Sequence, residues 1–164
     1  SKLIAKLLDN YEIDLVYKNF NSSFIPYSID PVVKFLKRYI DDGRIKLTNT
    51  KPIKIIKDFD LVLLDMLSTT FAETISIKVP SLIFSNKYDY SLLCDDGKKI
   101  NNLMQKNKIL FYEIDQGYEC FKNFKNKSND YFQENSELFI DYQEKIAYPQ
   151  TLRNFDDQLN NLRN

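Results

Sequence analysis

Residues 60–84, DLVLLDMLSTTFAETISIKVPSLIF, carry the pattern that decides the fold of this chain. They begin with the run 60–65, whose inner residues are all apolar, as is typical of a parallel strand covered by helices on both faces. A helix is predicted at about residues 70–78, because Pro80 cannot continue it, and residues 81–84 form the next apolar run. The stretch is therefore predicted to fold as strand, helix and strand, with its first strand central in a parallel sheet.

The alternation of apolar runs and helical patterns continues on either side of this stretch. Asp30 followed by Pro31 is typical of a helix start, and Gly43 is placed to end that helix in a left-handed conformation. Further strands are predicted at residues 13–17, 44–47 and 109–111, and further helices at residues 52–57 and 92–106. Such alternation favours parallel strands joined by right-handed crossovers. We predict an α/β fold with a Rossmann-like parallel sheet of about five strands and helices on both faces.

Residues 115–164 contain no strand pattern and are predicted to form a helical tail, with helices at residues 118–124, 128–146 and 152–162. We therefore expect residues 1–164 to fold as a single α/β domain. The chain begins with Ser1 rather than Met, and a helical pattern is already under way at Lys2. This beginning indicates a fragment of a longer protein.

The composition excludes several classes of function. Hydrophobic residues make up 43% of the 164 residues, enough for a packed core, and the 23 basic and 23 acidic residues balance, which argues against nucleic-acid binding. The chain has no histidine, so sites built on histidine are excluded. Its three glycines cannot supply a glycine-rich phosphate loop.

Neither a metal, a cofactor nor a membrane span is expected. The cysteines, Cys94 and Cys120, are too few for a zinc site, and the adjacent carboxylates of Asp95 and Asp96 point about 100° apart on a helix. No apolar run approaches the roughly 18 residues that cross a bilayer, and no signal-peptide pattern is present. We expect a cytoplasmic protein that could work at the inner face of a membrane.

Polar residues gather where the predicted strands end, and ligands of open parallel sheets bind beyond these carboxyl ends. Three such ends are followed by polar segments: residues 18–23, 65–70 and 85–90. The middle one places Ser68, Thr69 and Thr70 at a helix start and Glu73 one turn later. A helix N-terminus attracts phosphate through its free N–H groups and positive dipole, and a carboxylate nearby can accept hydrogen bonds from a ribose diol.

Two structural alternatives stay open. Thr70 and Glu73 have the spacing of a capping box, in which two residues bond only each other's backbone N–H groups. Tyr88 and Tyr90, after the next strand, could stack on a nucleobase or a sugar, or they could be partly buried tyrosines at an ordinary helix start.

Residues 60–84 resemble a motif of GT-B-type transferases: a strand ending near Asp, a serine with two threonines, a helix with a glutamate, a proline and a further strand. The likeness is to the carboxyl-terminal, donor-nucleotide-binding half of bacterial surface-carbohydrate transferases. It points to the LIC-type transferase family and, more distantly, to the glycerophosphotransferase and polysialyltransferase group. Residues 15–18, LVYK, also resemble a strand end of these families where a basic residue meets the donor phosphates.

The resemblance implies a role for each of these residues. The hydroxyls of residues 68–70 would hold the donor pyrophosphate, Glu73 the ribose and Lys18 the phosphates. Asn19 and Phe20 occupy the positions of the families' proline and histidine, so the catalytic residue stays unassigned. The resemblance further implies a missing amino-terminal domain that binds the acceptor.

The expected function is binding of a nucleotide-activated sugar or related donor for a glycosyl- or related transferase in surface polysaccharide biosynthesis, in a domain that is inactive alone. One alternative is a non-catalytic α/β module whose tail aromatics, within residues 131–148, form a protein-interaction or oligomerisation face. Another is half of a sugar-nucleotide epimerase, although the catalytic residues of such enzymes have no counterpart here.

Overall fold

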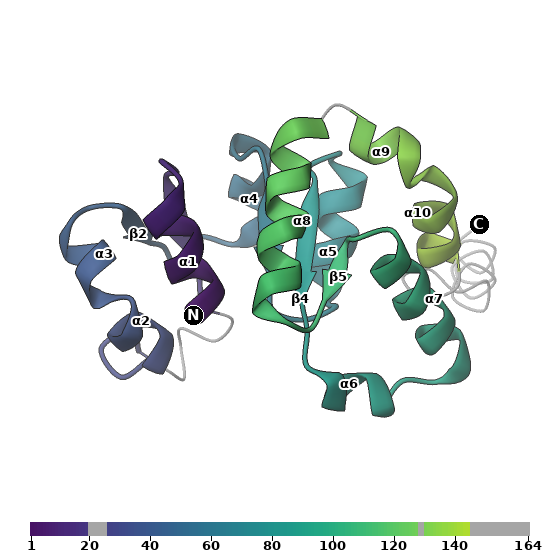
Figure 1. The fold of residues 1–164 in the computed structure, drawn as a ribbon, viewed down its shortest axis with the longest axis horizontal. Helices are drawn as coiled ribbons and strands as arrows, with labels where there is room; N and C mark the ends of the chain where they lie inside the picture. Colours follow the sequence, from purple (N-terminus) through teal and green to yellow (C-terminus); the bar gives the residue numbers. More distant parts are fainter. Residues whose placement is uncertain (20–25, 128–129, 145–164) are drawn as a thin grey trace, which may run out of the picture. The chain divides into compact units, whose positions relative to one another are not determined.

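The computed structural model describes residues 1–19, 26–127 and 130–144, which form an α/β structure of two compact units, Ser1–Ile55 and Ile56–Asn164 (Figure 1). We call them unit 1 and unit 2. Each unit has its own parallel sheet, with strand order β1-β2 in unit 1 and β3-β4-β5 in unit 2. The α/β class and the five strands are confirmed, but the prediction of one five-stranded sheet is wrong, because the strands divide between two sheets. The helix predicted at residues 152–162 lies outside the described residues.

Unit 1 packs its helices around a two-stranded sheet. Its elements are α1 (Lys2–Asn10), β1 (Leu15–Tyr17), α2 (Pro31–Phe35), α3 (Lys37–Asp41), β2 (Ile45–Leu47) and α4 (Pro52–Ile55). The core is formed by Leu8, Leu36, Tyr39 and Ile45. Gly43 follows α3 with a φ of 74°, the left-handed conformation that the sequence predicts at this position.

Asp30 holds the start of α2, as the Asp-Pro pair predicts. One carboxylate oxygen, Oδ1, accepts a hydrogen bond from the Val32 N–H at 2.8 Å. The other, Oδ2, accepts hydrogen bonds from the Tyr17 hydroxyl at 3.0 Å and from the Asn19 side-chain amide at 2.7 Å. Since Asp30 is only 3% exposed, this buried carboxylate ties the end of β1 to the first turn of α2.

Unit 2 alternates strands and helices and then ends its described part in helices. Its elements are a 3-10 helix (Ile56–Asp58), β3 (Val62–Leu64), α5 (Thr69–Ser76), β4 (Ser81–Phe84), α6 (Lys87–Ser91), α7 (Asp95–Lys106), β5 (Leu110–Phe111), α8 (Ile114–Lys127), α9 (Tyr131–Glu134) and α10 (Ser136–Tyr142). The central, buried strand of this sheet is β4. The strand predicted to be central, β3, lies at the edge of its sheet and is only half-buried.

The core of unit 2 lies on the face of the sheet that α5 covers, and α8 covers the opposite face (Figure 1). Phe71 of α5, Ile83 of β4 and Met104 of α7 are fully buried in this core. The tail contributes Tyr131, Phe139 and Tyr142 to the same core. Phe139 and Tyr142 each pack edge to face against Phe71, and the Tyr131 ring lies tilted against that of Phe139. These three aromatic side chains are therefore core residues rather than an interaction face, and Tyr148 lies outside the described residues.

The opposite face of the sheet is contacted closely by α8. A Cβ atom added at Gly117 would lie 2.3 Å from the nearest ring carbon of Phe111. That ring belongs to β5, is 2% exposed and packs beside Phe84 with ring centroids 5.5 Å apart. Glycine at position 117 is what allows α8 to lie this near to the sheet.

The hydroxyl of Tyr131 makes the two hydrogen bonds to the Ser81 backbone that a neighbouring strand would otherwise make. The Ser81 N–H and C=O point away from β3, because Val62 donates to the Pro80 carbonyl on that side. They face the β5 side, but β5 pairs with β4 only from Ile83 onward. The Tyr131 hydroxyl donates to the Ser81 carbonyl at 2.7 Å and accepts from the Ser81 N–H at 3.3 Å. Both buried backbone groups are thereby satisfied.

The variant Tyr131→Phe is expected to lower the free energy of unfolding of unit 2 by about 2 kcal/mol at neutral pH, because two buried backbone groups lose their partner. Burial raises the pKa of Tyr131 to about 12. The folded state therefore holds the phenolic proton more tightly than the unfolded chain, whose tyrosine pKa is about 10. The stabilisation that comes from this pKa difference is fully present below about pH 10, and it is lost as the pH rises from about 10 to about 12.

Urea unfolding followed by far-UV circular dichroism at about pH 8 and about pH 11 tests this pH dependence. The wild-type chain should lose more stability between these two pH values than Tyr131→Phe does. Tyr88→Phe is the matched control, since Tyr88 is 67% exposed and its ring is not part of the core. An equal loss in the wild type and in Tyr131→Phe contradicts the prediction.

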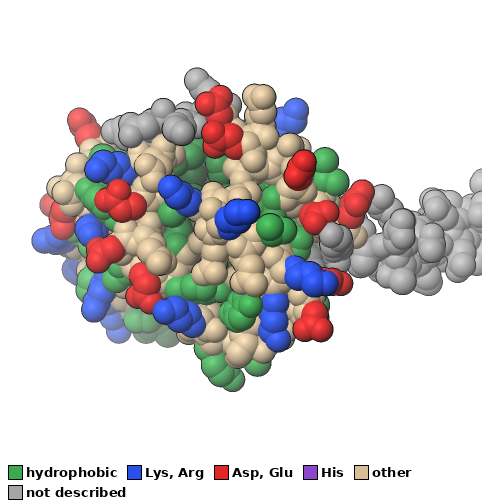
Figure 2. Space-filling view, turned by 45° about the vertical axis from the view of Figure 1, so that its right-hand side comes forward, with side chains coloured by type: hydrophobic (Ala, Val, Ile, Leu, Met, Phe, Trp, Pro, Cys, Tyr) green, Lys and Arg blue, Asp and Glu red, His purple; other side chains and the backbone are tan. Residues whose placement is uncertain are grey.

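The surface of the described residues carries mixed charge. On the face that Figure 2 shows, acidic and basic side chains are interspersed, in line with the balanced composition. None of the described helices has both the length and the apolarity needed to cross a bilayer.

Candidate functional site

The N-terminus of α5 is open. Ser68 precedes the helix with extended backbone angles, φ −139° and ψ 176°, and its side chain makes no capping hydrogen bond. The first turn contains no acidic residue, and within it the Phe71 N–H donates a hydrogen bond to the Ser68 carbonyl at 2.9 Å. The N–H groups and the positive dipole end of this turn are therefore not neutralised by the cap residue.

The capping-box alternative is wrong. The helix begins at Thr69 with Ser68 as its cap, so the position that would complete a capping box is Phe71, which has no polar side chain. Glu73 lies a turn further along the helix. Its Oε2 atom is buried and has no hydrogen-bond partner among the described residues. Since buried carboxylate oxygens are nearly always hydrogen-bonded, this atom needs an explanation.

The predicted site residues Ser68, Thr69, Thr70 and Glu73 all lie in the first two turns of α5 or at its cap. Thr69 is exposed, whereas the other three are half-buried. The structure thus places three hydroxyls and one carboxylate on one helix end, directly after the carboxyl end of β3.

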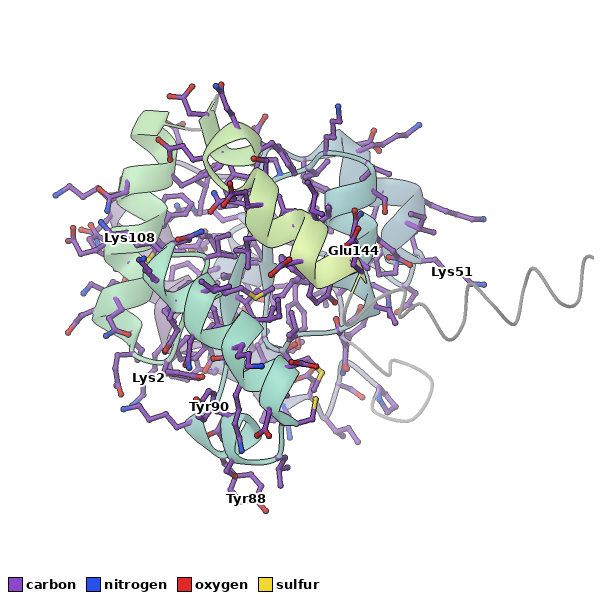
Figure 3. All side chains as sticks on the ribbon, turned by 90° about the vertical axis from the view of Figure 1, so that its right-hand side faces the viewer. Lys2, Lys51, Tyr88, Tyr90, Lys108 and Glu144 are labelled. Atoms are coloured by element: carbon purple, nitrogen blue, oxygen red, sulfur yellow. The ribbon has the colours of Figure 1, made fainter. Side chains whose placement is uncertain are left out.

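Tyr88 and Tyr90 lie in α6, which follows β4. Because β3 and β4 are adjacent and parallel, α6 starts at the same edge of the sheet as α5. Asn86 caps this helix by accepting a hydrogen bond from the Tyr88 N–H at 2.9 Å. Tyr88 is 67% exposed and points away from the ribbon (Figure 3), and Tyr90 is half-buried. Both tyrosines therefore lie at the same edge of the sheet as the start of α5, and Tyr88 is mostly exposed there.

Lys18 belongs to unit 1. It follows β1, and its Nζ donates a hydrogen bond to the neighbouring Asn19 carbonyl at 3.1 Å. The α5 residues belong to unit 2.

An ion pair at the same edge of unit 2 was missed by the sequence reasoning. Lys87 Nζ, after β4, lies 2.9 Å from Glu113 Oε1, after β5, and both side chains are mostly exposed. Among the described residues at the ends of the three strands, 65–68, 85–87 and 112–114, Lys87 is the one cation, while Asp65 and Glu113 are acidic. Their positions directly after the predicted strands were the signal that could have identified Lys87 and Glu113.

Two surface hollows lie elsewhere in unit 2. One, of about 470 Å³, is lined by α7 and by Asp141 of α10. The other, of about 550 Å³, lies between α7 and α8 beside β5 and includes Cys120. Burial raises the pKa of the Cys120 thiol, so this cysteine is a poor nucleophile at neutral pH.

The described residues contain no cluster of three or more acidic or cysteine side chains that could hold a metal ion.

Comparison with known proteins identifies no relative of this chain. No family model, no curated protein and no solved structure matches the chain. The transferase resemblance stays a prediction, and function has to be inferred from the geometry at the start of α5.

Proposed function

We propose that unit 2 binds a nucleotide-activated sugar or related donor at the N-terminus of α5, as the donor-binding part of a glycosyl- or related transferase in surface polysaccharide biosynthesis. The observation that carries the proposal is the buried, unpartnered Glu73 Oε2 one turn into a helix whose N-terminus is open. Leaving such an oxygen without a donor is costly, so a rotation of the Glu73 side chain that turns its carboxylate outward, toward the two hydroxyls of a ribose, would be favoured.

Each group at the start of α5 would bind a different part of the donor. The N–H groups of the first turn and the hydroxyls of Ser68, Thr69 and Thr70 would donate to the phosphate oxygens. These donors would stabilise the negative charge that grows on the departing nucleotide during transfer. Tyr88 or Tyr90 would offer a stacking surface for the base or the sugar. A phosphate-binding role of Lys18, in unit 1, stays a prediction from the resemblance.

The charge at this edge favours a donor with few phosphate charges. Lys87 is already paired with Glu113, and Asp65 adds a further exposed carboxylate. A second phosphate group would bring additional negative charge close to these carboxylates. We therefore expect nucleoside monophosphates to bind better than nucleoside diphosphates.

A nucleotide panel tests the proposal by thermal unfolding of the full chain. CMP, CDP, UDP and GDP are compared at rising concentration, and a ligand present at about 100 times its Kd should stabilise the fold by about 2.7 kcal/mol. We expect the largest rise in melting temperature with CMP. If none of the four shifts the melting temperature, the proposal is wrong.

Variants then locate the binding site. Glu73→Gln keeps the size of the side chain but removes its charge, and Ser68→Ala with Thr70→Val removes two phosphate donors; both should abolish most of the shift. Ser76→Ala is the matched control, because Ser76 lies at the other end of α5 and its hydroxyl donates to the Ala72 carbonyl of the same helix. A shift that survives Glu73→Gln and the Ser68→Ala, Thr70→Val double variant would place the nucleotide elsewhere.

A further inference from the structure

The helix α7 presents a stripe of side chains along the hollow that it forms with α10. Asp96, Lys99, Leu103 and Lys106 all line this hollow, and their spacing places them on one side of the helix. Figure 3 shows α7 and α10 together on the side of the molecule that faces the viewer. Leu103 is 39% exposed, although it is a leucine near the middle of the helix. Along the stripe, Leu103 is thus the apolar residue among charged neighbours.

The stripe is complementary to itself when it is reversed. Asp96 and Lys106 lie at equal distances along the chain from Asn101, and so do Lys99 and Leu103. In two antiparallel copies of α7 whose two-fold axis passes beside Asn101, Asp96 of each copy therefore faces Lys106 of the other. Lys99 then faces Leu103, over which its aliphatic stem can pack while its ammonium group stays in water.

We propose that the α7 stripe is a contact between two copies of this chain, paired antiparallel about a two-fold axis. A two-fold interface uses the same patch on both copies, so it requires the kind of self-complementary pattern that Asp96 and Lys106 provide. The chain has no net charge to keep copies apart. This proposal is independent of nucleotide binding, because the α7 stripe contains none of the residues assigned to the donor.

The charges of the stripe are available for such a contact. Within one copy Lys99 Nζ lies 3.2 Å from Asp96 Oδ1, and both side chains are largely exposed. In the pair, Asp96 lies between Lys99 of its own copy and Lys106 of the other. Asp96 and Lys106 are about 15 Å apart along the helix, so one copy cannot bring them together.

The expected complex is weak. The face of one helix whose apolar residue is Leu103 buries less area than the roughly 1,200–2,000 Å² of stable interfaces. We expect a reversible dimer with a Kd on the order of 10–100 µM, which corresponds to a small interface with few anchor residues.

Charge-reversal variants of the full chain give the sharpest test, with sedimentation velocity over about 5–500 µM as the measurement. Lys106→Asp alone and Asp96→Lys alone should each weaken the dimer by about tenfold or more, because two like-charged pairs replace two attractive ones. The double variant with Asp96→Lys and Lys106→Asp restores opposite charges and should return the Kd to within about threefold of the wild type. Leu103→Ser should weaken the dimer without any change of charge.

Controls separate loss of the contact from loss of the fold. Lys122→Asp reverses the charge of an exposed lysine on α8, away from the stripe, and should leave the Kd unchanged. Circular dichroism of every variant checks that it is folded. The proposal is overturned if the wild-type chain stays monomeric up to about 500 µM, a concentration well above the expected Kd. It is also overturned if dimerisation is the same in Lys106→Asp and Leu103→Ser as in the wild type, or if the double variant is no better than the single ones.

Discussion

Alanine at position 117 is expected to lower the free energy of unfolding of unit 2 by about 2–3 kcal/mol, or to prevent α8 from docking altogether. The added methyl group would lie 2.3, 2.7 and 2.9 Å from three ring carbons of Phe111. The ring cannot turn away freely, since it is buried and packs beside Phe84. Relief requires α8 to move off the sheet, which exposes apolar surface on both. Urea unfolding followed by far-UV circular dichroism measures the loss.

Gly97→Ala is the matched control for this substitution. It makes the same chemical change in α7, where the added Cβ would lie 3.2 Å from the Leu93 Cβ. Higher helix propensity and the tighter contact act in opposite directions there, so the stability should change by no more than about 1 kcal/mol. If Gly117→Ala is as stable as the wild type, α8 does not lie against Phe111 as described.

In unit 1 the largest effect is expected from Asp30→Ala, a loss of about 3 kcal/mol. The substitution removes the N-cap of α2 and the acceptor of hydrogen bonds from the Tyr17 hydroxyl and the Asn19 amide. Hydrogen exchange of the β1 and β2 amides is the suitable measurement, because it reports on unit 1 even where unit 2 stays folded.

Two further variants test the reason for this effect. Asp30→Asn keeps one acceptor oxygen and should recover part of the stability. Asp41→Ala is the control, since Asp41 is an exposed partner of Lys37 one turn away, and its loss should cost about 0.5 kcal/mol or less. Equal exchange rates in Asp30→Ala and Asp41→Ala would show that the Asp30 carboxylate does not hold unit 1 together.

The local elements could be predicted from the sequence because each has a local cause. The apolar runs gave all five strands, and the Asp30-Pro31 pair gave the start of α2. The partition into two sheets could not be predicted, since strands of two to four residues carry too little pattern to specify their partners. The run in β3 suggested a central strand, because an apolar strand half-covered at an edge has the same composition as a buried one.

The candidate site was predictable in its residue types but not in its geometry. The positions of Ser68, Thr69 and Thr70 at a helix start follow from the strand before them and from Pro80 after the helix. The isolation of Glu73 Oε2 depends on how its side chain packs, which the spacing to Thr70 could not reveal. The pairing of Lys87 with Glu113 joins residues from two strand ends, and only the strand order brings them together.

The bond between Tyr131 and Ser81 also affects the order in which unit 2 can be completed during synthesis. Ser81 belongs to the central strand, yet the group that satisfies its backbone comes from α9, which the ribosome makes much later. Until residue 131 has left the ribosome, this part of β4 keeps an unpaired N–H and C=O and remains open to pairing with other nascent chains. Rapid emergence of the tail, or a chaperone that covers β4 meanwhile, would protect the growing chain from such association.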